Sequence, residues 1–265
     1  MIGTLTVNGM VLSAMPMGEY DKRLTILTVE RGKISAFARG ARKPNSSLLA
    51  CSQPFSYGEF TAYAGRDSYT VTNAQISNYF PGLREDLGRL YLGMYFCEFA
   101  EYFTREGNDE REVLKLLYQS LRALESGKFP ASLVRRVFEL KLISIEGEAP
   151  QVSACVCCGQ KEEGELTHFY LSKDGAVCAP CAQDMISRYG RDIITPISPA
   201  CLYAMQYVIG TPSAQLYRFS LKKEALSEFA VRVGQYIKKH VEREMKTLQV
   251  LETMGVGEDE VENAP

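Results

Sequence analysis

The chain has 265 residues, with 30 basic and 32 acidic side chains, and 46% of its residues are hydrophobic. This composition excludes a disordered or collagen-like chain and a small disulfide-stapled fold, and the length predicts two or three structural units. No window approaches the roughly 18 apolar residues of a membrane span, and the N-terminal residues lack the pattern of a signal peptide. We therefore expect a cytoplasmic protein whose eight cysteines stay reduced unless a metal binds them.

Residues 4–80 carry the pattern of short strands. Alternating segments lie at 5–7, 24–29, 34–38, 55–63 and 69–72, and turn residues such as Arg31-Gly32-Lys33 separate them. Five short strands in about 80 residues fit a small closed barrel such as an OB-fold, because closure removes the exposed sheet edges. An SH3-like barrel fits the same pattern nearly as well. We predict a barrel domain at 1–82 that binds nucleic acid.

After Pro81-Gly82 the hydrophobic period becomes helical. An apolar stripe from Leu87 to Phe103 predicts one helix, and two more follow near 110–126, with Asp109 as its N-cap, and 131–146. A later pair is predicted at about 199–209 and 222–252. The fold class is therefore α+β and multidomain. The helical domain is expected at 83–150 and 199–254, with an insertion at 151–198 and an acidic disordered tail at 255–265.

Four cysteines form the strongest chemical motif in the chain. Cys155 and Cys158 make one C-x2-C pair, and Cys178 and Cys181 make a second pair after nineteen intervening residues. This spacing is typical of structural zinc ribbons, in which each pair wraps one side of a tetrahedral ion. Four sulfurs complete the ligand shell and leave no open position for a catalytic water. We therefore predict one structural Zn²⁺ ion.

Other cysteines and the two histidines are weighed against this zinc site. Cys157 and His168 lie within the insertion, but the two-residue spacing favours the other four thiols as ligands. A redox-active C-x-x-C remains an alternative, although no βαβ pattern accompanies it. We expect His240 at the surface of a charged helix. Three isolated cysteines are expected to be small core residues, namely Cys51, Cys97 and Cys201.

The sequence lacks the common motifs of enzyme active sites. It contains no phosphate-binding G-x-x-x-x-G-K-[ST], no dinucleotide-binding G-x-G-x-x-G, no G-x-S-x-G and no H-E-x-x-H. Neither of its two histidines lies near a candidate nucleophile. The sequence therefore predicts a binding protein without turnover chemistry.

The N-terminal segment supplies the residue types that bind nucleic acid. Seven basic side chains lie between Lys22 and Lys43, where Glu30 is the single acid. Arg39, Arg42 and Lys43 surround Gly40 just after the third predicted strand, where a loop can reach phosphates, and Arg23 and Lys33 lie on the strands before it. A solvated turn is the alternative for this loop. The aromatic residues available for base stacking are Phe37, Tyr57, Phe60, Tyr63 and Tyr69, of which about half must face the barrel interior.

Several of these segments, in this order, resemble the RecO family of bacterial DNA-repair proteins. The resemblance is carried by the basic loop 40–43, by Tyr79-Phe80-Pro81-Gly82-Leu83-Arg84-Glu85-Asp86-Leu87, by Tyr95-Phe96-Cys97-Glu98-Phe99 and by the four-cysteine segment. It covers nearly the whole chain except 255–265.

The resemblance implies a recombination mediator. It implies an OB-fold that binds single- and double-stranded DNA, a helical domain and, in many members, a zinc finger. It also implies that the protein anneals complementary strands, binds the C-terminal tail of single-strand DNA-binding protein, and acts with RecR to load RecA. A zinc-stapled scaffold that joins protein partners with little or no DNA binding is the alternative, because the net charge is only −2. A dithiol oxidoreductase is a third.

Overall fold

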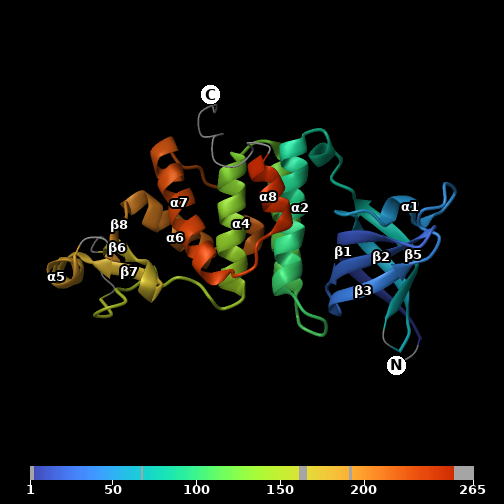
Figure 1. Cartoon of the computed structure of the whole chain (residues 1–265), viewed down its shortest axis with the longest axis horizontal. Helices are drawn as coiled ribbons and strands as arrows, with labels where there is room; N and C mark the ends of the chain where they lie inside the picture. Colours follow the sequence, from blue (N-terminus) through green and yellow to red (C-terminus); the bar gives the residue numbers. More distant parts are fainter. Residues whose placement is uncertain (1–2, 67, 161–165, 191–192, 254–265) are drawn as a thin grey trace. The chain divides into compact units, whose positions relative to one another are not determined.

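The structure, a computed structural model, describes residues 3–66, 68–160, 166–190 and 193–253. These residues fall into two compact units, one of residues up to 128 together with 245–253 and the other of 129–244 (Figure 1). The predicted acidic tail lies outside the described residues, and the predicted domain boundaries stay predictions. In the described ranges, no helix is long and apolar enough to cross a membrane.

Five strands form a closed barrel in the first unit, in the order β1-β2-β3-β5-β4 with β1 paired to β4. All of these pairings except that of β3 with β5 are antiparallel. β3 and β5 run parallel and pair over only two residues each. This is the Greek-key order of an OB-fold, so the predicted fold is confirmed and the SH3-like alternative is not. The strands are β1 (Gly3–Met17), β2 (Asp21–Thr28), β3 (Gly32–Ala38), β4 (Tyr57–Ala64) and β5 (Tyr69–Asn78).

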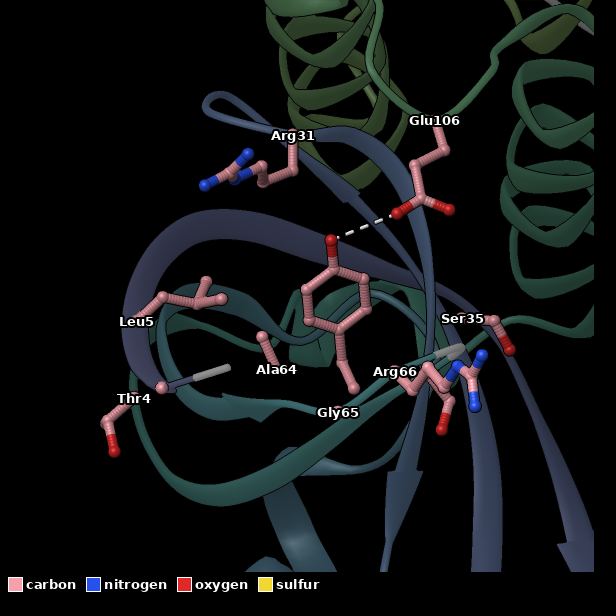
Figure 2. A pocket seen from close by; sticks show the side chains of 11 residues that line it. Thr4, Leu5, Arg31, Ser35, Ala64, Gly65, Arg66 and Glu106 are labelled. Atoms are coloured by element: carbon pink, nitrogen blue, oxygen red, sulfur yellow. Dashed lines mark hydrogen bonds between the residues drawn. The ribbon is translucent and has the colours of Figure 1, made fainter. Parts of the chain in front are cut away.

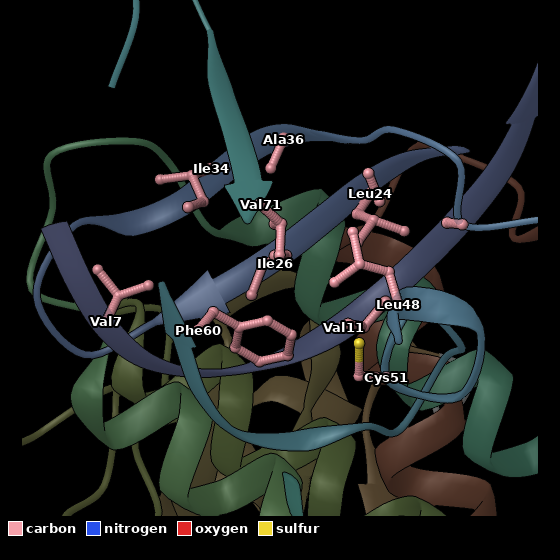
Figure 3. Close-up of a cluster of buried hydrophobic side chains, with 12 residues drawn as sticks. Val7, Val11, Leu24, Ile26, Ile34, Ala36, Leu48, Cys51, Phe60 and Val71 are labelled. Carbon is pink, nitrogen blue, oxygen red and sulfur yellow. The ribbon is translucent and has the colours of Figure 1, made fainter. Parts of the chain in front are cut away.

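Alternation along the strands fills the barrel with apolar side chains. Leu24, Ile26, Ile34 and Phe60 are each at most 1% exposed and pack together inside it (Figure 3). A short helix that the sequence did not predict, α1 (Leu48–Cys51), adds Leu48 and Cys51 to this core. The odd-numbered residues of β3 point the other way, and that outward side carries the candidate interface described below.

Three helices complete the first unit, namely α2 (Leu87–Phe103), α3 (Arg111–Ser126) and α8 (Lys246–Thr253), with a 3₁₀ turn η1 (Pro81–Arg84) before them. Asp86 caps α2 by accepting the Arg89 amide at 2.8 Å. The expected N-cap of α3 was wrong by one residue. Glu110 holds that position, while Asp109 accepts hydrogen bonds from Arg111.

The second unit contains α4 (Ala131–Ile145), α6 (Pro199–Gly210) and α7 (Lys223–His240), which pack on one another. It also contains β6 (Leu166–Tyr170), β7 (Gly175–Cys178), α5 (Ala179–Tyr189) and β8 (Thr195–Pro196), with 3₁₀ turns η2 (Leu171–Lys173) and η4 (Ser213–Gln215). The single helix predicted at 222–252 was wrong. It ends at His240, and a separate α8 packs against α2 in the first unit.

Candidate nucleic-acid interface and metal centre

One row of outward side chains crosses the barrel. The strand register places Met15 opposite Arg23, Arg23 opposite Phe37, and Phe37 opposite Thr70, which in turn lies opposite Tyr63. Directly paired residues point to the same side of a sheet, so these five side chains share the outer surface. We call them the outer row. Its exposed apolar members are unusual for a strand surface, since Met15 is 65% exposed and Tyr63 is 45% exposed.

Arg23 lies between the apolar members of the outer row. Its Nε donates to the Ser35 hydroxyl at 3.0 Å, which holds the guanidinium over β3. Its remaining N–H groups face solvent on an exposed side chain. A cation fixed between Met15 and Phe37 can pair with a phosphate while the flanking side chains contact bases.

The basic loop 39–43 continues from the β3 end of the outer row. Gly40 has a φ of +66°, a left-handed conformation that favours glycine, and its amide donates to Asp21 Oδ1 at 2.7 Å. The Arg42 amide donates to the Tyr20 carbonyl at 2.8 Å, and Ala41 is buried in the barrel core. The β1–β2 connection therefore holds this loop in one conformation.

The three cationic side chains of the loop all reach solvent. Arg39, Arg42 and Lys43 are exposed. Arg42 donates one N–H to the Gly18 carbonyl at 3.0 Å, and Lys43 Nζ lies 5.3 Å from the centre of the Tyr20 ring. Both contacts orient the charge and leave further N–H groups to pair with an anion. Arg23, Arg39, Arg42 and Lys43 are thus exposed on β2 and on the loop that follows its neighbour β3.

Lys33 does not join this group. It lies on β3 facing the same side, but its ammonium donates to the backbone carbonyl of Glu101 near the end of α2. Its own amide donates to the Arg105 carbonyl at 3.0 Å, which ties β3 to the segment after α2. The side chain is only partly exposed. The geometry therefore gives Lys33 a structural contact in place of the expected phosphate contact.

The five expected stacking residues differ in what surrounds them. Phe60 is fully buried inside the barrel, and Tyr57 packs on Tyr118 with ring centres 4.6 Å apart. Tyr69 donates its hydroxyl to Glu106 at 3.0 Å. Only Phe37 and Tyr63 lie on the outer row. Sequence reasoning missed Met15, because the Met15-Pro16-Met17 segment does not look like a strand although β1 extends through it, and it missed Tyr20 in the β1–β2 connection.

The second unit brings together the sulfurs of Cys155, Cys158, Cys178 and Cys181, all within 4.8 Å of one another. Two local turns produce this. Gly159, at φ +77°, closes the first knuckle by donating its amide to the Cys155 carbonyl at 2.9 Å. Cys178 ends β7 and begins α5, whose first turn carries Cys181.

The separations of the sulfurs fit a tetrahedral ion. Zn–S bonds of about 2.3 Å put ligand sulfurs roughly 3.8 Å apart in an ideal tetrahedron. The sulfurs of Cys158 and Cys178 lie 3.7 Å apart, far beyond a disulfide bond. Burial alone would raise the pKa of the Cys155 thiol, but backbone amides of Cys178, Cys158 and Cys157 donate to it and lower the pKa to about 6. The four cysteines can therefore hold a metal ion.

The remaining cysteines and His168 are not part of this cluster. Cys157 is exposed and its sulfur lies 3.6 Å from the sulfur of Met185. His168 Nδ1 contacts the Thr167 hydroxyl at 2.9 Å. Cys51, Cys97 and Cys201 are buried, as predicted, and burial raises the pKa of the Cys201 thiol to about 12. These buried thiols are packing residues with little thiolate character.

Both units match models of the same protein family. Residues 1–80 match the model described as Recombination protein O N terminal, and residues 84–249 match Recombination protein O C terminal. The chain belongs to the RecO family. The DNA repair protein RecO of Acetivibrio thermocellus is 30% identical over 251 residues, covering 94% of this chain and 97% of that relative. The RecO protein of Bacillus subtilis is 29% identical over 246 residues, covering 93% of each chain.

These relatives are named as DNA repair proteins, which is consistent with DNA as a partner. A third relative, the RecO protein of Bacillus pumilus, is 38% identical over 173 residues, covering 65% of this chain and 66% of that relative. The resemblance carried by the basic loop, the aromatic helix and the four cysteines is thus confirmed at the level of the family.

Proposed function

We propose that this protein is a recombination mediator in DNA repair. It binds single- and double-stranded DNA, anneals complementary strands and, with RecR, helps load RecA onto DNA coated by single-strand DNA-binding protein. It works in the cytoplasm, on the nucleoid. Membership of the RecO family supports this proposal, together with the surface that the first unit presents to solvent.

The observation that carries the proposal is the juxtaposition of the outer row and the basic loop. Phe37 is only two residues before Arg39, so a stacking surface passes directly into a cationic loop. Arg39, Arg42 and Lys43 would pair with phosphates, while Phe37 and Tyr63 would stack on bases. Stacking and phosphate contacts are independent of base sequence, as a mediator that acts on any strand requires.

Annealing needs no catalytic residue in this proposal. A basic surface that neutralises phosphates on two strands removes much of their repulsion and raises their local concentration. Base pairing then supplies the remaining free energy. We therefore assign the protein no enzymatic reaction of its own.

The metal in the proposal is one structural Zn²⁺ ion held by Cys155, Cys158, Cys178 and Cys181. Four thiolates fill its shell, so the ion stabilises the fold of the segment that holds it and has no open position for a substrate. The protein partners are RecR and the C-terminal tail of single-strand DNA-binding protein, with RecA engaged indirectly. An acidic, apolar tail requires a cation beside an apolar groove, which we assign to the helices.

Binding to a fluorescent single-stranded oligonucleotide across a salt series tests the DNA-binding step. Four cations, Arg23, Arg39, Arg42 and Lys43, predict a slope of log K against log salt near −3, at about −0.7 for each phosphate. The variant Arg39→Glu/Arg42→Glu/Lys43→Glu should lose most of its affinity and about two units of that slope. The matched control Arg218→Glu/Lys222→Glu/Lys223→Glu changes three exposed cations of the second unit.

Two outcomes would contradict the proposal. Equal losses in both triple variants would indicate a general effect of charge, not a site on the barrel. No binding by the wild-type protein at low salt would favour a zinc-stapled scaffold for protein partners. A thermal melt of each variant confirms that the protein is folded before its binding is compared.

A further inference from the structure

Two exposed methionines lie at the β1 end of the outer row. Met15 belongs to the row, and Met17 follows two residues later, so both side chains point to the same side of the strand. They are 65% and 47% exposed, and no other methionine in the described ranges is exposed. Met94 is half-buried, and the rest are buried, namely Met10, Met185, Met205 and Met245.

The strand that carries these methionines is open along one edge. β1 pairs with β4 only from Gly3 to Met10, and from there to Met17 it pairs with β2 alone. In the part of the chain that the structure describes, no strand pairs with the other edge of residues 13–17. Pro16, which has no amide hydrogen to leave unpaired, suits such an edge. A small oxidant in solution can therefore reach both thioethers without any opening of the barrel.

The two methionines differ in the residue that lies opposite each on β2. Met15 lies opposite Arg23, whereas Met17 lies opposite Asp21. Directly opposite side chains on an antiparallel pair have Cβ atoms about 4.5–5.5 Å apart. The Arg23 guanidinium leans toward β3, where it donates to Ser35, so it does not cover Met15. A DNA strand whose phosphate pairs with Arg23 would pass beside Met15, while the carboxylate of Asp21 repels phosphates from Met17.

The other end of the outer row is well separated from the methionines along the strands. Tyr63, the last member, lies opposite Thr4, eleven residues before Met15 on β1. Thr4 lines a pocket of about 590 Å³ together with Ala64 and Gly65 (Figure 2), and no methionine is among the described residues that line it. A chemical change at Met15 therefore leaves the Tyr63 end of the row intact, and we expect it to weaken DNA binding without abolishing it.

We propose that Met15 is a site of reversible oxidation by hydrogen peroxide, and that its sulfoxide lowers the affinity of the outer row for single-stranded DNA. The effect on affinity rests on the proposed function. The thioether sulfur attacks one peroxide oxygen, so that an S–O bond forms, the O–O bond breaks and the second oxygen leaves as water. The sulfur loses two electrons and the peroxide gains them. Methionine sulfoxide reductase reverses the step with two thiols, which become a disulfide as water is released.

The loss of affinity follows from the polarity of the sulfoxide. A thioether gains free energy when a base or sugar covers it, because apolar surface leaves water. A sulfoxide oxygen holds water as a hydrogen-bond acceptor, and covering it without a donor costs free energy. Oxidation at Met15 should therefore lower single-strand affinity about tenfold, which is about 1.4 kcal/mol. Oxidation at Met17 should change it little.

The experiment treats the full chain with increasing hydrogen peroxide and maps the added oxygen by peptide mass spectrometry. Because Cys157 and Cys158 are exposed as well, a dithiol then reduces the oxidised cysteines, and the metal content is measured again. Affinity for a fluorescent single-stranded oligonucleotide is compared before and after treatment, and after methionine sulfoxide reductase. The wild type is compared with Met15→Leu and Met17→Leu, which keep an apolar side chain and cannot form a sulfoxide.

A second pair of variants needs no oxidant. Met15→Gln places a polar side chain of similar length at the same position. Leu87→Gln is the matched control, since Leu87 lies on α2 in the same unit, is 61% exposed and is not a member of the outer row. Met15→Gln should lower affinity about as much as the sulfoxide does, and Leu87→Gln should leave it unchanged.

In the wild type, Met15 and Met17 should gain oxygen before the other methionines, and affinity should fall about tenfold and recover with the reductase but not with the dithiol. Met15→Leu should keep its affinity after treatment, whereas Met17→Leu should lose it as the wild type does. Equal losses in Met15→Leu and the wild type would overturn the proposal, as would unchanged affinity of a protein fully oxidised at Met15 or an equal loss in Leu87→Gln. If the untreated wild type does not bind, the proposed function fails; binding that oxidation does not alter overturns this inference alone.

Discussion

The imidazole of His240 and the carboxylate of Asp174 meet at 2.8 Å, although they lie 66 residues apart in the chain. His240 ends α7, and Asp174 lies in the turn between β6 and β7, with a φ of +56°. Lys239 Nζ reaches the same carboxylate oxygen at 2.7 Å, and Tyr236 stacks on the imidazole with ring centres 4.3 Å apart. One carboxylate thus attaches the hairpin of the cysteine segment to the last turn of α7.

Replacing Asp174 with Asn should weaken this attachment. Asn tolerates the left-handed backbone conformation, so the turn is kept while the charge that pairs with Lys239 and His240 is lost. We expect a loss of about 1 kcal/mol in unfolding free energy, because the ion pairs are partly exposed, and faster amide hydrogen exchange across β6 and β7. Lys173→Gln, one residue earlier and outside these contacts, is the control. Unchanged exchange in Asp174→Asn would contradict the prediction.

The same contact predicts a pH dependence. Burial alone would raise the pKa of Asp174, but hydrogen bonds from Lys239 and His240 outweigh it and lower the pKa. A carboxyl whose pKa is lower in the folded state stabilises the fold above its unfolded pKa of about 3.9, and this contribution is lost as the pH falls through the folded pKa. The stability difference between the wild type and Asp174→Asn should therefore be present above about pH 4 and disappear as the pH falls below that value. A difference that grows as the pH falls below about 4 would have the wrong sign.

Zinc removal distinguishes the four clustered cysteines from Cys157. We expect one Zn²⁺ per chain in the wild type and in Cys157→Ser, and little or none in Cys155→Ser or Cys181→Ser, by elemental analysis of purified protein. Because the ion would stabilise a segment with a small apolar core, a strong chelator should raise amide exchange in 166–190 and leave the barrel protected. Zinc loss in Cys157→Ser equal to that in Cys155→Ser would exclude the proposed ligand set.

Local pattern was enough to predict the barrel, the first three long helices and the cysteine cluster. The strands alternate, the helices carry apolar stripes, and the cysteine spacing is a local property. The break between α7 and α8 could not be predicted, because no Gly or Pro marks it. Glu98 of α2 accepts the amides of Lys246 and Thr247 at 3.0 and 2.9 Å, and so caps α8 from 148 residues away. His240 was expected at the surface because its partner Asp174 lies 66 residues away in sequence, beyond the reach of a local pattern.

The choice among basic and aromatic residues also depended on tertiary structure. Alternation shows that half of the aromatic side chains on a strand face outward, but it does not show what packs against them. Tyr57 lies against Tyr118 of α3 and Lys33 reaches α2, whereas Phe37 lies on the outer row.

A buried ion cluster in α4 should contribute more to stability than exposed pairs of the same spacing. Glu139 is fully buried and accepts from Arg135 Nε at 2.9 Å and from Arg136 Nη1 at 2.8 Å, while both arginine side chains are only 11% exposed. Glu139→Gln removes the negative charge that both largely buried guanidinium groups contact, and we expect a loss of about 3 kcal/mol in unfolding free energy. Asp184→Asn, which breaks the exposed pair with Arg188 in the same unit, should cost less than about 1 kcal/mol. Equal losses in denaturant titrations would refute this ranking.

Stacking on the outer row should be separable from phosphate contact by its salt dependence. Phe37→Ala and Tyr63→Ala each remove a ring without removing charge, so single-strand affinity should fall by about 1–3 kcal/mol per lost stack while the slope of log K against log salt stays the same. Arg39→Gln should instead reduce the magnitude of that slope by about 0.7. Tyr203→Ala, at a tyrosine of α6 that is 66% exposed, is the matched control and should leave affinity unchanged. If Phe37→Ala lowers the slope as Arg39→Gln does, or if Tyr203→Ala loses equal affinity, bases do not stack on this row.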